Sequence, residues 1–146
     1  MPDVPAFPAD PVELARFLDD RGRDRLPGLL GLELLDLGAG SCTMALEVER
    51  RHEAPNGYLH AATVVALADT ATGYGCVASL PAGAIGFTTL ELKSNHTGTL
   101  SSGRMTARAT MTHGGRITQI WDATVVADET GRTIGLFRNT QLILYP

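Results

Sequence analysis

The segment from residue 60 to about residue 79 predicts one long apolar helix with a single carboxylate, Asp69, in its middle. At 100° per residue, the neighbours of Asp69 on its helix face are small or apolar: Ala62, Val65, Ala66, Thr72, Gly73 and Cys76. No second acid or base accompanies Asp69 to make a solvated face. A helix of this composition has to be buried, so the rest of the chain must wrap around it.

Asp69 is the first candidate functional residue. Burying a carboxylate is costly unless the group is paired or used in chemistry. An acid in such a position is therefore a candidate general base or nucleophile with a shifted pKa. The alternative is structural: Asp69 lies at a subunit seam, or caps a neighbouring loop and is satisfied by backbone donors. The helix alone leaves both interpretations open.

The remaining segments predict strands and one further helix. Asp10 is placed to cap a short helix that begins at Pro11 and stops near Gly22. Alternating apolar residues predict strands at residues 32–37, 43–49, 88–95, 104–112, 116–127 and 133–144. Short loops join the last three strands, which predicts an antiparallel meander. The predicted class is α+β, with a curved antiparallel sheet wrapped around one long central helix.

Composition excludes several classes of protein. A chain of 146 residues with 44% hydrophobic residues suits one domain, and a net charge of −4 with scattered Lys and Arg argues against nucleic acid as a partner. Two cysteines are too few for a disulfide framework or a zinc site, and the four histidines lack ligand spacing, so we expect no metal. With no long apolar run and an acidic, proline-rich residue 1–5 segment, we expect a cytoplasmic protein without a membrane partner.

The loop and first half of the long helix resemble those of the hot dog fold acyl-CoA thioesterases, in the group of the phenylacetate-degradation thioesterases and 4-hydroxybenzoyl-CoA thioesterase. That pattern has a loop Gly, then His-Gly-Gly, then an acid nine residues after the His, often within Leu-Ala-Asp. Here Gly57 precedes His60, and Asp69 ends the matching Leu-Ala-Asp. The resemblance implies a hot dog domain at residues 31–146, preceded by an N-terminal extension, residues 1–30, with a short helix.

The resemblance also implies roles for individual residues. Asp69 would be the base or nucleophile, the Ala61 N–H would hold the thioester oxygen at the helix N-terminus, and Thr89 would orient the attacking water. His60 is more simply a helix cap than a catalytic group. The residues implied in substrate binding are Asn56, Gly57, His60, Ala62, Thr88 and Arg116. No cofactor is implied, because coenzyme A is part of the substrate.

Two positions depart from the family pattern. The usual Gly-Gly after the histidine is Ala61-Ala62, and the loop position six residues before the histidine, often Asn or Gln in relatives, is Ala54. An alanine N–H can still donate to the substrate, but the methyl group narrows the approach. Asn56, two residues further along, offers an amide in place of the missing one.

The leading hypothesis is therefore hydrolysis of an aryl-CoA or medium-chain acyl-CoA by at least a homodimer, with a homotetramer expected. In the family, the acid and the oxyanion donor come from facing subunits. One alternative is a hot dog hydratase or dehydratase, for which His52 and Glu53 are available but without the spacing of those enzymes. The other is a noncatalytic acyl-CoA binding protein, against which the retained Asp69 argues.

Overall fold

The computed structural model describes residues 6–146, so the residue 1–5 segment considered above lies outside it. The helices are α1 (Pro11–Gly22), α2 (Leu26–Leu30) and α3 (Ala61–Ala78), with a 3-10 turn at Arg50–His52. The strands are β1 (Glu33–Gly38), β2 (Ser41–Val48), β3 (Gly86–His96), β4 (Gly103–Gly114), β5 (Thr118–Ala127) and β6 (Thr133–Leu144).

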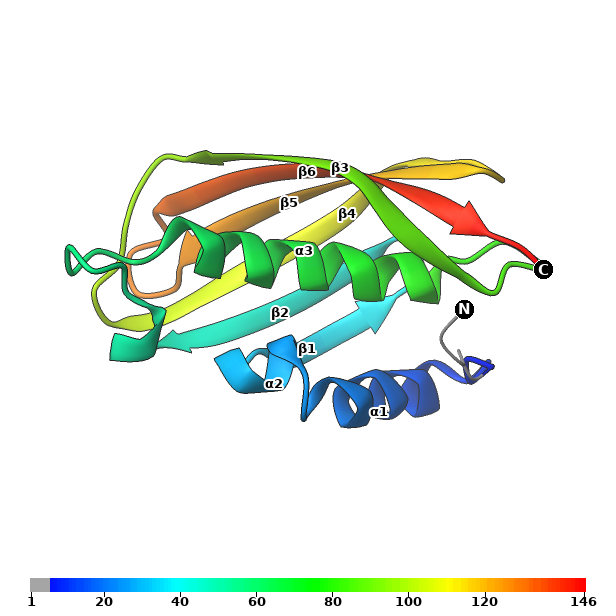
Figure 1. Ribbon diagram of the computed structural model, residues 1–146, viewed down its shortest axis with the longest axis horizontal. Coiled ribbons are helices and arrows are strands. Elements are labelled where there is room, and N and C mark those ends of the chain that lie inside the picture. Colours follow the sequence, from blue (N-terminus) through cyan, green and yellow to red (C-terminus); the bar gives the residue numbers. More distant parts are fainter. Residues whose placement is uncertain (1–5) are drawn as a thin grey trace.

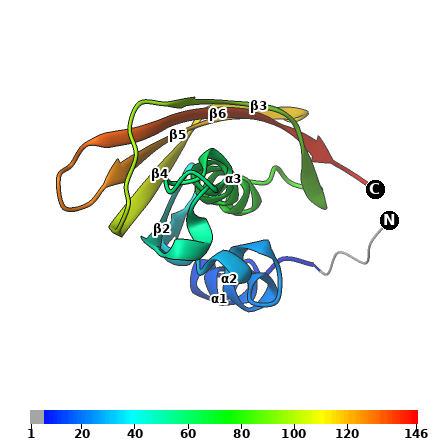
Figure 2. The ribbon, with the colours of Figure 1, turned by 60° about the vertical axis from the view of Figure 1, so that its left-hand side comes forward.

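The six strands form one antiparallel sheet in the order β1-β2-β4-β5-β6-β3, which curves around α3 (Figures 1 and 2). This confirms the predicted α+β hot dog architecture. By length and composition α3 is apolar enough to cross a membrane, but 56% of its span is buried inside the fold, where it forms the core helix.

The central helix begins and ends at residues that bond to its own backbone. The His60 ring accepts a hydrogen bond from the Ala62 N–H at 3.0 Å, as expected of a helix cap. At the other end, the Ser79 hydroxyl donates to the Gly75 carbonyl at 2.8 Å. Gly75 allows the close approach of helix and sheet, because a Cβ there would lie 2.6 Å from the Trp121 ring.

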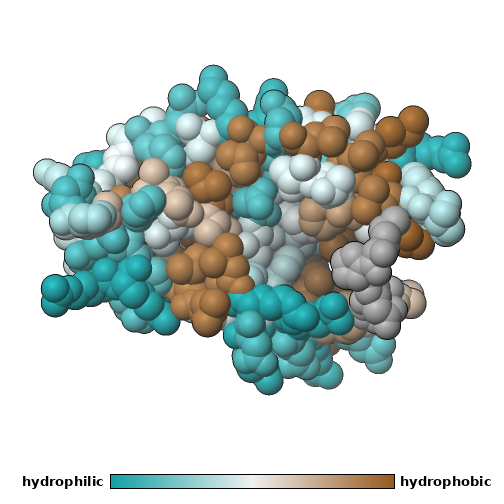
Figure 3. Space-filling view, viewed as in Figure 1, coloured by the Kyte–Doolittle hydropathy of each residue, from teal (hydrophilic) through white to brown (hydrophobic). Residues whose placement is uncertain are grey.

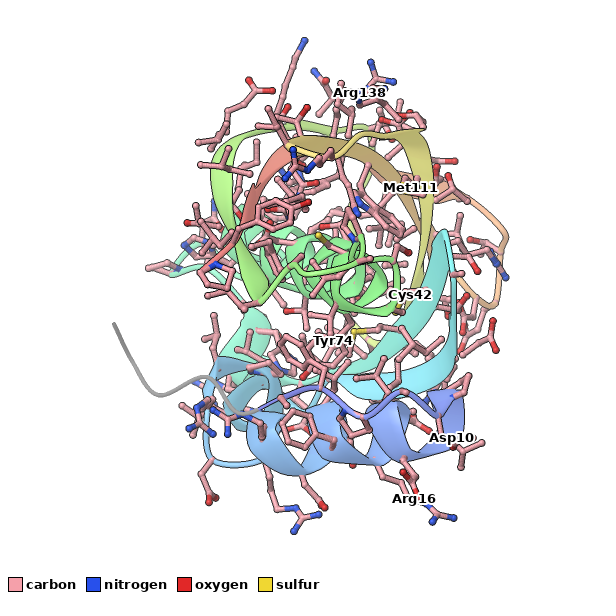
Figure 4. All side chains as sticks on the ribbon, turned by 90° about the vertical axis from the view of Figure 1, so that its right-hand side faces the viewer. Asp10, Arg16, Cys42, Tyr74, Met111 and Arg138 are labelled. Carbon is pink, nitrogen blue, oxygen red and sulfur yellow. The ribbon has the colours of Figure 1, made fainter. Side chains whose placement is uncertain are left out.

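The N-terminal extension contains two helices where the sequence predicted one. Asp10 caps α1 as predicted, with its carboxylate accepting from the N–H groups of Val12 and Glu13. The additional helix, α2, has only five residues, too few to show a hydrophobic period. Both helices lie across α3 from β3 and β6 (Figure 2), and α1 packs against the edge strand β1. Tyr74 of α3 points toward α1 and donates to the Leu18 carbonyl at 3.1 Å (Figure 4).

The two edges of the sheet differ. β1 has six residues and packs against α1, whereas β3 has eleven and carries Leu90 and Leu92, which are 57% and 44% exposed. A bulge between Thr89 and Glu91 shifts the register of β3, and Leu92 then lies opposite Asn139 of β6. Figure 3 shows hydrophobic surface over part of the region where β3 runs. This long edge strand therefore exposes two leucines and has no strand paired with its outer side among residues 6–146.

Candidate active site

Asp69 lies in the middle of α3, partly buried, with its side chain toward β6. Its Oδ1 accepts a hydrogen bond from Asn139 Nδ2 at 3.0 Å, and the same amide donates to Thr72 Oγ1 at 2.7 Å. Within residues 6–146 no backbone N–H and no cation bonds the carboxylate, so the structure does not support the loop-capping alternative. Burial raises the pKa of Asp69, and the hydrogen bond from Asn139 opposes that rise.

Two buried amides on β6, Asn139 and Gln141, form a row of polar side chains: Asn139 contacts Asp69, and Gln141 contacts Thr89. Asn139 and Gln141 are both fully buried, and Gln141 Oε1 accepts a hydrogen bond from the Thr89 hydroxyl at 2.8 Å. Asn139 Oδ1 and Gln141 Nε2 are buried without a partner in the described part of the chain. Unpaired buried polar atoms are rare, so this row marks a polar site inside an apolar fold. The sequence analysis did not identify either amide.

The N-terminus of α3 presents the predicted oxyanion donor. The Ala62 N–H donates to the His60 ring. The backbone N–H of His60 donates in turn to the His52 carbonyl at 2.9 Å, which fixes the position of His60. The Ala61 N–H has no hydrogen-bond partner among residues 6–146, and Ala61 is exposed. A free N–H at the positive end of a helix dipole is suited to bind a negatively charged oxygen.

Ala61 and Asp69 of one chain do not face the same space. An α-helix rises about 1.5 Å per residue, so eight residues separate their backbones by about 12 Å along the axis. A single thioester carbonyl cannot contact both groups at hydrogen-bond distance. A site that uses both must therefore combine Ala61 of one subunit with Asp69 of another.

The predicted binding loop is compact and exposed. The Ala54 N–H donates to the Tyr58 carbonyl at 2.7 Å, and Asn56 Oδ1 accepts from the Tyr58 N–H at 3.2 Å. Gly57 adopts a left-handed conformation with φ of 82°, which explains the glycine at this position. Asn56 lies at the loop tip with its side chain exposed, and its role in binding stays a prediction.

The side chains of Thr88 and Arg116 form no hydrogen bond with Asn139 or Gln141 within residues 6–146. Thr88 is exposed on β3, opposite Leu142 of β6. Arg116, predicted to begin a strand, lies instead in the turn before β5, because the Gly115 N–H closes that turn on the Thr118 carbonyl at 2.9 Å. Its guanidinium stacks over Tyr145 at 5.3 Å. The turn lies beyond the C-terminal end of α3, far from His60 (Figure 1).

His52, which as a loop histidine is expected from the sequence to be solvated and was considered for the hydratase alternative, is instead buried and has a structural role. Its Nδ1 accepts from the Glu49 N–H at 2.9 Å, and its Nε2 lies 2.8 Å from the Leu30 carbonyl and donates to it. Both ring nitrogens are thus occupied by backbone, and the ring has no nitrogen left for proton transfer. Among residues 6–146 no group of three or more His, Cys, Asp or Glu is placed to hold a metal.

A cavity of about 400 Å³ opens beside Asp69. Its walls come from α3, from the start of β3 and from the N-terminal extension. The lining is mostly apolar, with Asp69 and Thr70 at one side. A partly buried carboxylate next to an apolar cavity is the usual arrangement of a small-molecule site.

Comparison with known proteins identifies the family of this site. A model of the thioesterase superfamily matches residues 56–134, which include the binding loop, all of α3 and β3, and the strands up to the start of β6. The chain belongs to the thioesterase superfamily. It is therefore a thioester hydrolase of the hot dog fold, as the family resemblance implied.

Relatives agree with this assignment. The chain is 33% identical over 111 residues to a 1,4-dihydroxy-2-naphthoyl-CoA hydrolase of Listeria monocytogenes, covering 76% of this chain and 89% of the relative. A mutant thioesterase from Pseudomonas aeruginosa superposes with a TM-score of 0.83 at 28% identity, over 89% of this chain and 93% of that one. A mutant of the phenylacetic acid degradation protein PaaI from Thermus thermophilus superposes with a TM-score of 0.74 at 28% sequence identity. The superposition covers 81% of this chain and 97% of that one.

Proposed function

We propose that this thioesterase hydrolyses coenzyme A thioesters of aryl or medium-length acyl groups, with Asp69 as the general base or nucleophile. The observation that carries the proposal is the Asp69 carboxylate itself: its pKa is raised by burial, one side-chain amide holds it, and it borders a cavity of about 400 Å³. The aryl class is supported by the naphthoyl-CoA substrate in the name of the Listeria relative.

Two routes are compatible with this geometry. In the first, Asp69 takes a proton from water, the resulting hydroxide attacks the thioester carbonyl, and the C–S bond breaks as the leaving thiolate is protonated. In the second, Asp69 attacks the carbonyl directly, coenzyme A leaves, and water hydrolyses the acyl anhydride. Both routes place negative charge on the carbonyl oxygen, which the Ala61 N–H would stabilise. Thr89, at the other end of the polar row, would orient the water.

The proposed site requires a dimer. Because Ala61 and Asp69 of one chain are about 12 Å apart along α3, the partner has to supply one of them. The unpaired edge of β3 is the surface proposed for this contact, since Leu90 and Leu92 there are exposed and the opposite edge packs against α1. Two such dimers would form the expected tetramer.

The activity is tested by a screen of acyl-CoA esters with detection of free thiol. We expect turnover of aryl or medium-chain esters by the wild type and almost none by Asp69→Asn, with circular dichroism showing that the variant is folded. Turnover by the variant near the wild-type rate would reject Asp69 as the catalytic acid. Binding of acyl-CoA without thiol release by the wild type would favour the noncatalytic alternative.

The oxyanion donor is tested at Ala61. Ala61→Pro removes the N–H but is acceptable in the first helical turn, so we expect a folded protein that loses roughly 3 to 4 kcal/mol of transition-state stabilisation. Ala61→Gly is the matched control, because it keeps the N–H and removes only the methyl group. If the proline variant turned over substrate as fast as the glycine variant, the oxyanion would be bound elsewhere.

The dimer is tested by light scattering coupled to size-exclusion chromatography. Replacing both Leu90 and Leu92 with Lys should convert the protein to monomers and abolish activity, because each site needs two chains. Leu35→Lys is the control, since Leu35 is 47% exposed on β1, at the opposite edge of the sheet from β3. A folded, active wild-type monomer at micromolar concentration would contradict the proposal.

A further inference from the structure

The cavity beside Asp69 is partly built by a segment outside the matched family region. Leu18, Gly22 and Pro27 of the N-terminal extension line it together with Val77 of α3 and Phe87 of β3. Its volume of about 400 Å³ lies within the range of small-molecule sites. The extension therefore shapes a space that borders the catalytic carboxylate.

The extension is held firmly against α3. Leu14 and Leu18 of α1 form a small buried cluster with Val77 of α3. The Tyr74 hydroxyl bonds the Leu18 carbonyl at 3.1 Å, and Gly22 leaves room for that hydroxyl, because a Cβ there would lie 2.6 Å from it. The wall that α1 supplies is thus part of the folded core, and this side of the cavity is preformed.

Two arginines of the extension, Arg21 and Arg25, also line this cavity. In residues 6–146 neither forms an ion pair: the Arg21 guanidinium lies over the Phe17 ring at 5.5 Å, and Arg25 donates to the Arg21 carbonyl. Arg23, which lies between them in sequence, is paired with Asp20 and does not line the cavity. The cavity thus has two cations that lack an anionic partner in this part of the chain.

These cations do not neutralise the catalytic acid. Within residues 6–146 neither arginine forms a hydrogen bond or an ion pair with the Asp69 carboxylate, which accepts from the Asn139 amide. Arg21 and Arg25 belong to the N-terminal extension and Asp69 belongs to α3, and apolar side chains such as Leu18 and Phe87 line the same cavity. A ligand with a reactive carbonyl at one end, an apolar middle and an anionic oxygen at the other end complements this lining.

We propose that α1 and α2 form the distal wall of the acyl pocket and that Arg21 and Arg25 select acyl groups with a carboxylate at the far end. This inference rests on the proposed function. The phosphates of coenzyme A are a second source of anionic oxygen. The acyl group fits better, because the pantetheine arm separates those phosphates from the thioester, whereas the arginines share one cavity with Asp69.

The test compares pairs of substrates that differ only in the distal carboxylate: adipoyl-CoA against hexanoyl-CoA, and 4-carboxybenzoyl-CoA against benzoyl-CoA. The readout is the ratio of kcat/KM for the carboxylated over the neutral ester. We expect the wild type to favour the carboxylated ester in at least one pair, and the Arg21→Gln/Arg25→Gln double variant to lower that ratio about tenfold or more. A wild-type ratio below one in both pairs, or an unchanged ratio in the double variant, would overturn the inference.

Arg23→Gln is the matched control. It removes a positive charge from the same segment, but Arg23 does not line the cavity. An equal fall in the ratio with Arg23→Gln would show a general charge effect and overturn the inference. The double variant is also assayed with the same acyl groups on pantetheine, which has no phosphate. Loss of the arginine effect there would assign the two cations to coenzyme A and reject the acyl carboxylate.

A failure of the proposed function gives a different result. If the wild type released thiol from none of these esters, hydrolysis of acyl-CoA by Asp69 would be rejected. The inference is then decided by calorimetric titration of the Asp69→Asn protein with adipoyl-CoA and hexanoyl-CoA, with and without the arginine substitutions. Tighter binding of the dicarboxylic ester that depends on Arg21 and Arg25 would support the selective pocket, and equal binding would reject it.

Discussion

The two long faces of α3 are made of similar small residues but meet different surfaces. On one face Leu67, Ala68 and Ala71 are fully buried in the apolar core that the helix shares with β2 and β4. On the other, Asp69 and Thr72 contact the Asn139 amide of β6, where buried polar atoms have no partner among residues 6–146. The first face has the chemistry of a protein core, and the second has the chemistry of a binding site.

The difference shows how one helix can serve stability and function separately. Apolar contacts on the β2 and β4 side stabilise the fold in proportion to the area removed from water. On the β6 side, a partly buried carboxylate with a raised pKa costs stability at neutral pH, and this carboxylate is the group proposed to react. Substitutions on the two faces should therefore separate activity from stability.

The largest expected effect is on the polar face, at Asp69→Asn. Loss of the base or nucleophile should lower kcat/KM at least about a thousandfold, which corresponds to about 4 kcal/mol. The same change should raise stability at pH 7. Because the folded-state pKa of Asp69 is raised above its ordinary 3.8, its contribution is favourable below that value and is lost as pH rises through the folded pKa.

Thermal unfolding of the wild type and Asp69→Asn at pH 7 and near pH 3.5 checks the stability half of this prediction. The variant should unfold at a higher temperature at pH 7, and the gap should narrow at low pH, where the wild-type carboxyl is protonated. A variant that unfolded at a lower temperature than the wild type at pH 7 would show that ionised Asp69 stabilises the fold.

The apolar face should respond in the opposite way. Leu67 is fully buried, so Leu67→Ala should lower the free energy of unfolding by about 2 to 5 kcal/mol through lost contacts and a residual cavity. Activity per folded molecule should stay close to the wild type, because Leu67 lies about 200° around the helix from Asp69. Urea denaturation measures the first quantity, and assays below the transition measure the second. A loss of kcat matching that of Asp69→Asn would remove the distinction between the faces.

The smallest expected effect is at Asn139, which positions Asp69. Asn139→Ala removes the one side-chain donor to the carboxylate found among residues 6–146. Because that donor lowers the Asp69 pKa, its loss should move the acidic limb of the kcat/KM profile to higher pH. We expect a loss of up to about tenfold near that limb and a smaller loss well above it. A uniform loss at every pH, with the limb unmoved, would instead indicate a merely structural role for Asn139.

Much of the fold was predictable because its signals are local. The apolar run around Asp69 required a buried central helix, alternation marked each of the six strands, and Asp10 marked the start of α1. The predictions were weakest where backbone contacts determine whether a residue is buried or lies in a loop. The buried state of His52 depends on the Leu30 carbonyl, and the loop position of Arg116 depends on a turn closed by Thr118.

The candidate site was predictable only in part. The spacing of His60 and Asp69 indicated the helix cap and the acid, because both lie on one helix and their relation depends on sequence distance alone. Asn139 and Gln141 left a signal that was available but not used: in β6 they occupy the same alternating positions as the buried Phe137 and Ile143. Polar residues at core-facing positions of a strand indicate a polar partner across the fold.

The sequence by itself determined that one apolar helix with a lone acid would be enclosed by an antiparallel sheet, since period and burial follow from the order of residue types. Only the tertiary structure decided which strand faces Asp69, that the N-terminal extension helps to enclose the adjoining cavity, and that Ala61 points to a different space. Those facts depend on contacts between segments up to 70 residues apart, as from Asp69 to Asn139, which no local pattern records.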